Sequence, residues 1–435
     1  MGQPEHPYSA QTRANEARAF AAERAGSGIV DAWPIKMIFE FTAACNLHCF
    51  MCGFEMTRDK LRATGRTKFV LDEAMFHKIA ETAFPHISIA SPTVSGEPFV
   101  LPYFDAMIEA GEKYDTKFEL FTNGMLLRGE RLHRLMPRLA CLTVSFDGAT
   151  KPTFDYVRTG GKFEVVLENV QNFAKLRREL GLREQIEFNF NVTLLAENVH
   201  ELPQIVEIAA ANDVDTVTAG YVMVLDESVR KSSPLNCPEK TNEALRAAHR
   251  KGEELGIVVR LPKPLPSHAP RLIRVEGGSG ADSLDTPAVP TPVEIEAAPE
   301  QAPAATAAPT PEPQAPVALD PEPTPRTELT EGSEPVHKFL HGMPADWGGK
   351  FYCNMPWRQV FIGQSGEVWP CCSPSRPQFG NGFEQDFMEI WNGPEYQRLR
   401  EGLYSGDLPD YCKRCPFLQE AGTQPLDAQG FIHTT

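Results

Sequence analysis

The chain of 435 residues is too long for one ordinary domain and predicts two or three. Its formal net charge of −16 argues against nucleic acid as a partner. No apolar run of about 18 residues and no apolar N-terminal segment occurs, so neither a transmembrane helix nor a secretory signal is predicted. Ten cysteines in such a chain favour metal ligation in a reducing compartment over disulfides, and we expect a cytoplasmic protein.

The first 262 residues predict a short N-terminal extension followed by an α/β domain. Residues 9–25 predict an exposed helix within the extension, 1–34. Between 35 and 262, short β-prone runs alternate with longer helical patterns, which predicts right-handed βαβ units and a parallel sheet. The predicted strands are 35–41, 86–91, 117–122, 140–146, 185–194 and 214–218, with 257–261 as a further short strand. The predicted helices are 72–83, 102–114, 128–137, 162–180, 198–211 and 240–255.

Three cysteines follow the first predicted strand in C-x3-C-x2-C spacing: Cys45, Cys49 and Cys52. A strand that ends by delivering three thiols into one loop indicates a metal site. Three thiolates leave an iron of a cluster, or a zinc ion, with one open position, as a catalytic metal requires. A zinc loop, or three unrelated buried thiols, is the simpler alternative.

The loops after the next predicted strands carry polar side chains that can face the same end of a parallel sheet. Strand two is followed by Ser-Gly-Glu-Pro, in which Gly96 permits close backbone approach and Glu97 offers an acceptor to an ammonium group. Strand three ends at Asn123 in a Thr-Asn-Gly turn, and strand four ends at Ser145. Arg158 follows, and its planar guanidinium suits a carboxylate, although a surface charge beside a glycine turn is the alternative.

The segment 263–337 changes character. Between residues 275 and 336 there are thirteen prolines, and twelve Asp or Glu against one Arg. Such a composition cannot bury enough apolar surface to order itself, so we expect a disordered, acidic, Pro- and Ala-rich linker.

A second cysteine cluster lies in the next segment, 338–420, before a tail at 421–435. Cys353 and Cys371 are delivered by a predicted strand-turn-strand, and Cys412 and Cys415 by a helix and loop. Four thiolates can close a tetrahedral zinc site or complete the ligation of a four-iron cluster. The neighbouring Cys372 is an alternative to Cys371, and a zinc ribbon is the alternative for the whole site.

The first motif and its downstream loops resemble the radical S-adenosylmethionine (SAM) superfamily, and the second cluster resembles a SPASM or shortened "twitch" auxiliary domain. The resemblance implies a partial (β/α)6 TIM-like barrel, the linker, and a small cysteine-rich domain. It also implies a 4Fe-4S cluster on Cys45, Cys49 and Cys52 that binds SAM, and a second, auxiliary 4Fe-4S cluster on Cys353, Cys371, Cys412 and Cys415. The remaining candidates, Gly96, Glu97, Asn123, Ser145 and Arg158, are then expected to contact SAM.

The function that this resemblance implies is reductive cleavage of SAM to a 5′-deoxyadenosyl radical, which abstracts hydrogen from the substrate. The cysteine spacing resembles that of 2-deoxy-scyllo-inosamine dehydrogenases, so we expect an oxidoreductase that dehydrogenates a small polyol or amino sugar. An external one-electron donor such as flavodoxin or ferredoxin is implied. The alternatives are a maturase that modifies a ribosomal peptide, a radical SAM epimerase, and a non-catalytic metal-binding scaffold.

Overall fold

The computed structural model describes residues 8–56, 58, 69–225, 227–266, 343, 346–372, 376–413, 415 and 418–420. The chain divides into one compact unit, formed by Met1–Ser267 with Arg326–Thr435, and a second unit, His268–Pro325. The second unit lies outside the described residues, as do nearly all of the predicted linker and the whole predicted tail.

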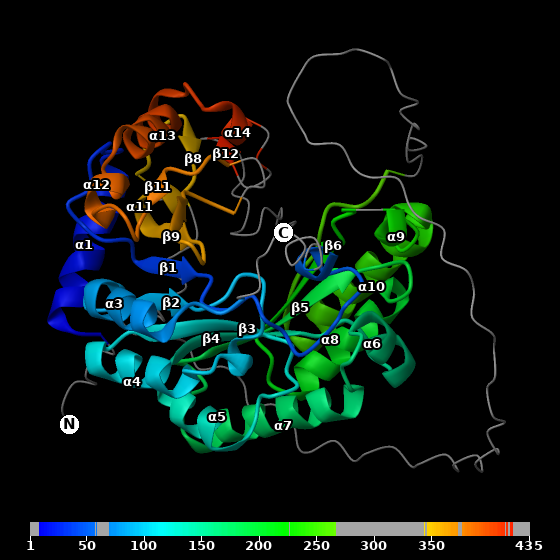
Figure 1. The fold of residues 1–435 in the computed structure, drawn as a ribbon. Helices are drawn as coiled ribbons and strands as arrows, with labels where there is room; N and C mark the ends of the chain where they lie inside the picture. Colours follow the sequence, from blue (N-terminus) through cyan, green and yellow to red (C-terminus); the bar gives the residue numbers. More distant parts are fainter. Residues whose placement is uncertain are drawn as a thin grey trace, which may run out of the picture. The chain divides into compact units, whose positions relative to one another are not determined.

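The described residues of the first unit form a ten-stranded sheet in the order β11-β10-β9-β1-β2-β3-β4-β5-β6-β7 (Figure 1). The strands from β1 to β7 run parallel to one another, which confirms the predicted α/β fold. Their bounds are β1 Lys36–Phe39, β2 Ile89–Ser91, β3 Lys117–Thr122, β4 Leu139–Ser145, β5 Glu187–Leu194, β6 Thr216–Tyr221 and β7 Val258–Arg260.

The C-terminal segment extends this sheet beyond β1, a pairing that local sequence patterns did not predict. Strand β9 (Gln359–Ile362) lies parallel to β1, with Gln359 opposite Lys36. Strands β10 (Glu367–Trp369) and β11 (Gly380–Asn381) then continue in antiparallel order. A separate two-stranded sheet pairs β8 (Phe351–Tyr352) with β12 (Gln419–Glu420).

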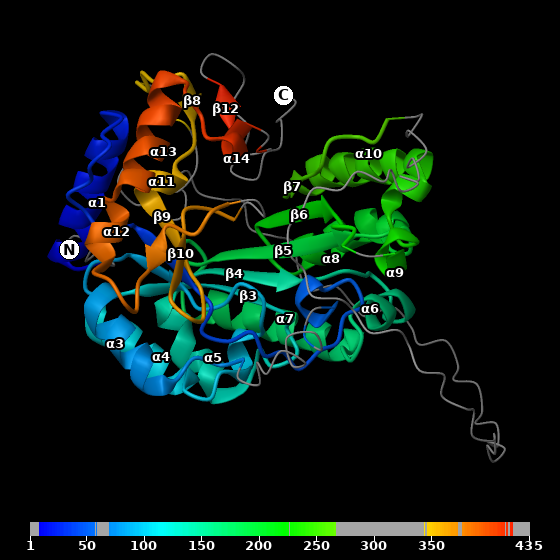
Figure 2. The same ribbon diagram turned by 45° about the horizontal axis from the view of Figure 1, so that its top comes forward.

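Helices cover one face of the parallel strands, and Figures 1 and 2 both show α3, α4, α5 and α7 on the same side. None of the helices that the structure describes has the length and apolar character that crossing a bilayer requires. The bounds in the first part of the chain are α1 Ala10–Arg24, α3 Glu73–Ala83, α4 Phe104–Tyr114, α5 Gly129–Leu135, α6 Lys151–Val157, α7 Phe163–Glu179, α8 Leu202–Ala211, α9 Glu227–Arg230 and α10 Pro238–Leu255. Those in the C-terminal part are α11 Met355–Arg358, α12 Phe387–Trp391, α13 Pro394–Ser405 and α14 Asp410–Lys413.

The two faces of the sheet differ in polarity, because successive side chains of a strand point to opposite faces. In β5, Phe188, Phe190 and Val192 are buried in the core that the strands share with the helices. The alternate residues Asn189 and Asn191 are only half-buried on the other face. The face turned away from the helices is therefore polar and can line a site.

Helix α1 is less exposed than the sequence predicted. Ala19 and Glu23 are fully buried, and Glu23 forms an ion pair with Arg358 at 2.5 Å from Oε2 to Nε. The prediction was wrong for this face of the helix, because the partner of Glu23 lies 335 residues further along the chain.

Candidate functional site

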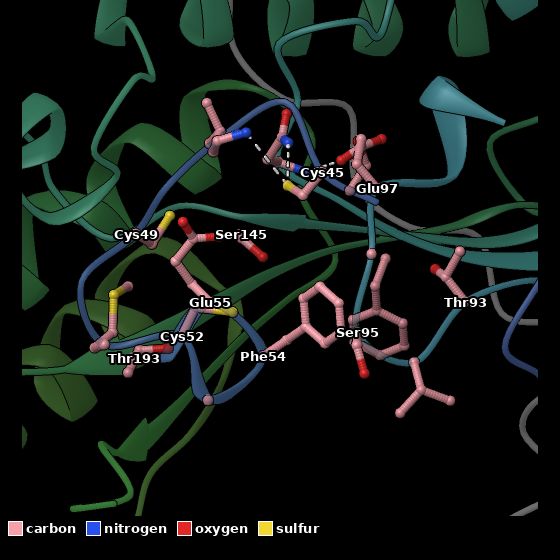
Figure 3. Close-up of a pocket in the computed structure, with 18 of the residues that line it drawn as sticks. Cys45, Cys49, Cys52, Phe54, Glu55, Thr93, Ser95, Glu97, Ser145 and Thr193 are labelled. Carbon is pink, nitrogen blue, oxygen red and sulfur yellow. Dashed lines mark hydrogen bonds between the residues drawn. The ribbon is translucent and has the colours of Figure 1, made fainter. Parts of the chain in front are cut away.

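The cysteine loop after β1 enters a cavity of about 680 Å³, which Cys45, Cys49 and Cys52 all line (Figure 3). None of the three forms a disulfide. The Cys45 thiol accepts hydrogen bonds from Leu47 N at 3.4 Å and from Asn123 Nδ2 at 3.7 Å. Burial raises the pKa of Cys45 to about 11, so this thiol stays protonated at neutral pH unless a metal displaces the proton.

Glu97 lies in the wall of this cavity and is only 1% exposed. Its Oε1 accepts hydrogen bonds from Thr122 Oγ1 at 2.8 Å and from Phe99 N at 3.2 Å, and its Oε2 accepts one from Asn123 N at 2.7 Å. These donors favour the carboxylate, but burial outweighs them and raises the pKa of Glu97 to about 7. A cation placed in the cavity beside Glu97 would therefore hold it ionised.

Gly96 brings its loop into direct contact with the backbone that leads into the cysteine loop. A Cβ at this position would lie 2.3 Å from the carbonyl oxygen of Thr42 and 2.7 Å from that of Ala44. Next to it, Glu97 N donates a hydrogen bond to Ala44 O at 2.8 Å. The sequence suggested close approach of a ligand at Gly96; the structure adds a packing role that positions the cysteine loop.

Replacing Gly96 by alanine is expected to destabilise the fold by about 1–3 kcal/mol, because the backbone oxygens in contact cannot move aside like a flexible side chain. Chemical denaturation of the purified chain measures this cost. Gly220→Ala is the matched control, because a Cβ at Gly220 in β6 meets no atom within 4 Å. Equal denaturation midpoints for Gly96→Ala and Gly220→Ala would show that the Gly96 loop can move away from the backbone of Thr42 and Ala44 without loss of stability.

Asn123 connects two parts of the site through its side chain. Its Nδ2 donates to Asn46 Oδ1 at 2.9 Å, in addition to its long contact with the Cys45 thiol. Its Oδ1 accepts from Met125 N at 3.0 Å. Asn123 therefore orients the Cys45 side chain and has little hydrogen-bonding capacity left for another ligand.

Arg158 is held at the cavity by a buried partner that the sequence did not assign to it. Its Nε lies 2.5 Å from Oδ2 of the fully buried Asp147, whose Oδ1 accepts from Thr193 N at 2.6 Å. The charge of the guanidinium also favours the thiolate form of the nearby Cys49. Ser145, at the end of β4, lines the same cavity beside Thr193. Because Asp147 occupies one edge of the guanidinium, only its remaining N–H groups can face a bound anion.

The first cavity also contains residues that sequence reasoning did not identify as site residues. Lys36, Ser91 and Glu119 line it from β1, β2 and β3, and Gln359 lines it from β9. For the two charged residues, Lys36 and Glu119, the sequence did carry a signal. Each is a charged residue inside a largely apolar strand, as in the Lys-Met-Ile-Phe run of β1.

The second cysteine set lies around another cavity, of about 40 Å³. Cys353, Cys371, Cys412 and Cys415 all line it, and so does Cys372. Burial, with a smaller contribution from the neighbouring Cys371 and Cys415, raises the pKa of Cys412 to about 12. The structure thus brings together the four cysteines predicted for this site, and it leaves the choice between Cys371 and Cys372 open.

Each cavity offers thiols as its donor set, and thiolates are the usual ligands of iron–sulfur clusters. Among the described residues, no three His, Cys, Asp or Glu side chains are arranged to hold a single metal ion. The thiols that line the two cavities fit an iron–sulfur cluster by their chemistry.

Protein-family models match two separate parts of the chain. The model of the radical SAM superfamily matches residues 39–209, and that of the SPASM iron-sulfur cluster-binding domain matches residues 353–416. The chain therefore carries a radical SAM domain and a SPASM iron-sulfur cluster-binding domain. These two domains imply 4Fe-4S clusters and SAM as the cofactors.

Three similar proteins show how far the likeness extends. The tungsten-containing aldehyde ferredoxin oxidoreductase cofactor-modifying protein of Pyrococcus furiosus is 26% identical over 52% of this chain and 62% of its own length. The PqqA peptide cyclase of Rhodopseudomonas palustris is 26% identical over 46% of this chain and 50% of its own length. The structure of Streptococcus suis SuiB bound to precursor peptide SuiA has a TM-score of 0.53 at 12% identity, covering 92% of this chain and 74% of SuiB. The chain thus spans between half and two thirds of the two curated relatives, and SuiB shares its fold.

Proposed function

We propose that this protein is a radical SAM enzyme that modifies a peptide. When bound, the cofactors supply reductive cleavage of SAM and a radical able to abstract hydrogen from an unactivated carbon. The observation that carries the proposal is one cavity lined by the three cysteines, Glu97 and Arg158. Cys45, Cys49 and Cys52 would hold the first cluster, and the second cysteine set would hold the auxiliary one.

The polar residues of the cavity fit the two charged ends of SAM. The Glu97 carboxylate suits the ammonium group, since its pKa of about 7 would fall beside a cation. Arg158 suits the carboxylate with the N–H groups that Asp147 leaves available. Gly96 and Asn123 would act by positioning the cysteine loop. Ser145, at the end of β4, would contact SAM directly.

Two activities remain candidates, and different observations favour them. The peptide cyclase and the cofactor-modifying protein among the relatives support modification of a peptide or a cofactor at least as well as dehydrogenation. The polar inner face of the sheet, with Lys36, Ser91 and Glu119 in the cavity, favours the polyol or amino sugar that the sequence suggested. An external one-electron donor is part of either proposal.

The test is stimulation of SAM cleavage by an extract of the source organism. The anaerobically reconstituted full chain is incubated with SAM, a reductant and the extract, and 5′-deoxyadenosine is quantified. We expect the extract to increase its formation and protease treatment of the extract to remove the effect. Stimulation that survives protease would favour a small-molecule substrate and reject the peptide.

A further inference from the structure

The amino ends of β1 and β9 place two polar residues side by side at the end of the cavity opposite the cysteine loop. Lys36 and Gln359 are register partners in parallel strands, so their side chains share a face. Both line the cavity, together with Glu119 from β3. The cysteine loop follows the other end of β1, so this group does not belong to the cofactor residues described above.

Lys36 and Glu119 form an ion pair that is largely removed from water. The Lys36 Nζ lies 2.5 Å from Glu119 Oε1, and the two side chains are 9% and 13% exposed. The charges of the two groups cancel, and Ser91 adds only a hydroxyl that donates to the backbone oxygen of Glu119 at 3.0 Å. A charged ligand here would meet a like charge at one member of the pair, so the group is suited to an uncharged ligand.

Gln359 is the residue that points to a ligand. It is only 5% exposed, and within the part of the chain that the structure describes its side-chain amide makes no hydrogen bond. Its amide is not one of the fully enclosed polar groups that lack a partner, so the amide opens to the cavity, where a bound ligand can supply its hydrogen bonds. The amide carries donors and an acceptor, so its natural partner is an uncharged group that both donates and accepts.

We infer that Gln359, with the Lys36–Glu119 pair beside it, forms a substrate subsite for an uncharged group that both donates and accepts hydrogen bonds. A carboxamide of a peptide and a hydroxyl of a polyol share this chemistry. The inference rests on the proposed function and identifies which part of the substrate the enzyme recognises. It also gives β9, which lies in the segment that the SPASM model matches, a direct role in the first cavity.

The first test uses stability and needs no substrate. Gln359→Leu removes an amide that has no hydrogen-bond partner among the described residues, so its melting temperature should equal or exceed that of the wild type. Asn198→Leu is the matched control, because Asn198 is a buried amide with three hydrogen bonds, to Leu195 N, Asp147 O and Thr193 O. Asn198→Leu should melt at a lower temperature than the wild type. A comparable fall for Gln359→Leu would assign Gln359 to the fold and overturn the inference.

The second test measures binding of small probes to the full chain by saturation-transfer NMR. Acetamide and glycerol represent the carboxamide and the hydroxyl, and acetate and methylammonium represent charged groups. We expect saturation transfer to acetamide or glycerol that is lost in Gln359→Leu. The stronger of the two signals shows whether the subsite prefers a carboxamide or a hydroxyl. Equal transfer in the variant, or a Gln359-dependent signal only from a charged probe, would overturn the inference. Since these probes require no turnover, the result stands apart from the extract assay that tests the proposed function.

Discussion

Cys353→Ala is expected to abolish substrate modification while leaving slow, uncoupled cleavage of SAM. The variant removes one of the four cysteines around the second cavity and leaves the cavity that holds Cys45, Cys49 and Cys52 unchanged. Removal of the Cys353 thiol from water raises its pKa well above the ordinary value, and the neighbouring cysteines add to this effect. A cluster bound here would displace the protons of these thiols and hold them as thiolates.

The measurement compares 5′-deoxyadenosine with modified substrate, each quantified by mass spectrometry under reducing conditions. Cys237→Ala is the control, since Cys237 precedes α10 and lines neither cavity. Its product yield should match that of the wild type. Loss of both products in Cys353→Ala would assign the second site to structure and remove its role in the reaction. The same assay on Cys371→Ala and Cys372→Ala identifies which of these two thiols is required.

The ion pair between α1 and the C-terminal segment should have the largest effect on stability. Arg358 bonds Glu23 through two nitrogens, with Nε at 2.5 Å from Oε2 and Nη2 at 2.8 Å from Oε1, and Tyr352 Oη donates to Oε1 at 2.7 Å. All of these groups are buried. Glu23→Ala leaves the Arg358 charge buried without its partner, so we expect a loss of about 3–5 kcal/mol in the free energy of unfolding.

This loss should also reach the second cysteine set, because Tyr352 is the residue before Cys353. Urea unfolding measures the stability, and iron content after reconstitution reports the site. Glu395→Ala is the control, since its ion pair with Arg398 is exposed and should contribute less than about 1 kcal/mol. A Glu23→Ala midpoint equal to that of Glu395→Ala would show that α1 does not hold the C-terminal segment. Replacing Glu23 and Arg358 together by apolar residues should recover part of the loss.

The sequence predicted the parts of the fold that depend on local pattern. The alternation of β-prone and helical runs located β3 at 117–122 as observed and the other parallel strands within a few residues. The loops that carry Cys45, Glu97 and Asn123 follow consecutive parallel strands, so their meeting at one cavity follows from the topology.

The parts that the sequence did not predict depend on contacts between distant segments. The pairing of β9 with β1 joins strands that are more than 300 residues apart, and no local periodicity encodes it. The burial of Glu23 and the place of Gln359 in the first cavity both follow from that pairing or from contacts near it. The ion pair between Arg158 and Asp147 was missed for a different reason: helix α6 lies between the two residues in the chain, and their spacing alone also fits separate roles.

Anaerobic reconstitution of the full chain tests most directly whether the protein holds two clusters and cleaves SAM. It is followed by iron and sulfide counting and a reductive SAM-cleavage assay. We expect about eight irons per chain, four for each cysteine set, together with formation of 5′-deoxyadenosine. About four irons with SAM cleavage would limit the chain to one cluster and remove the auxiliary role of the second set. Zinc in place of iron, with no SAM cleavage, would contradict the assignment of radical SAM chemistry to this protein.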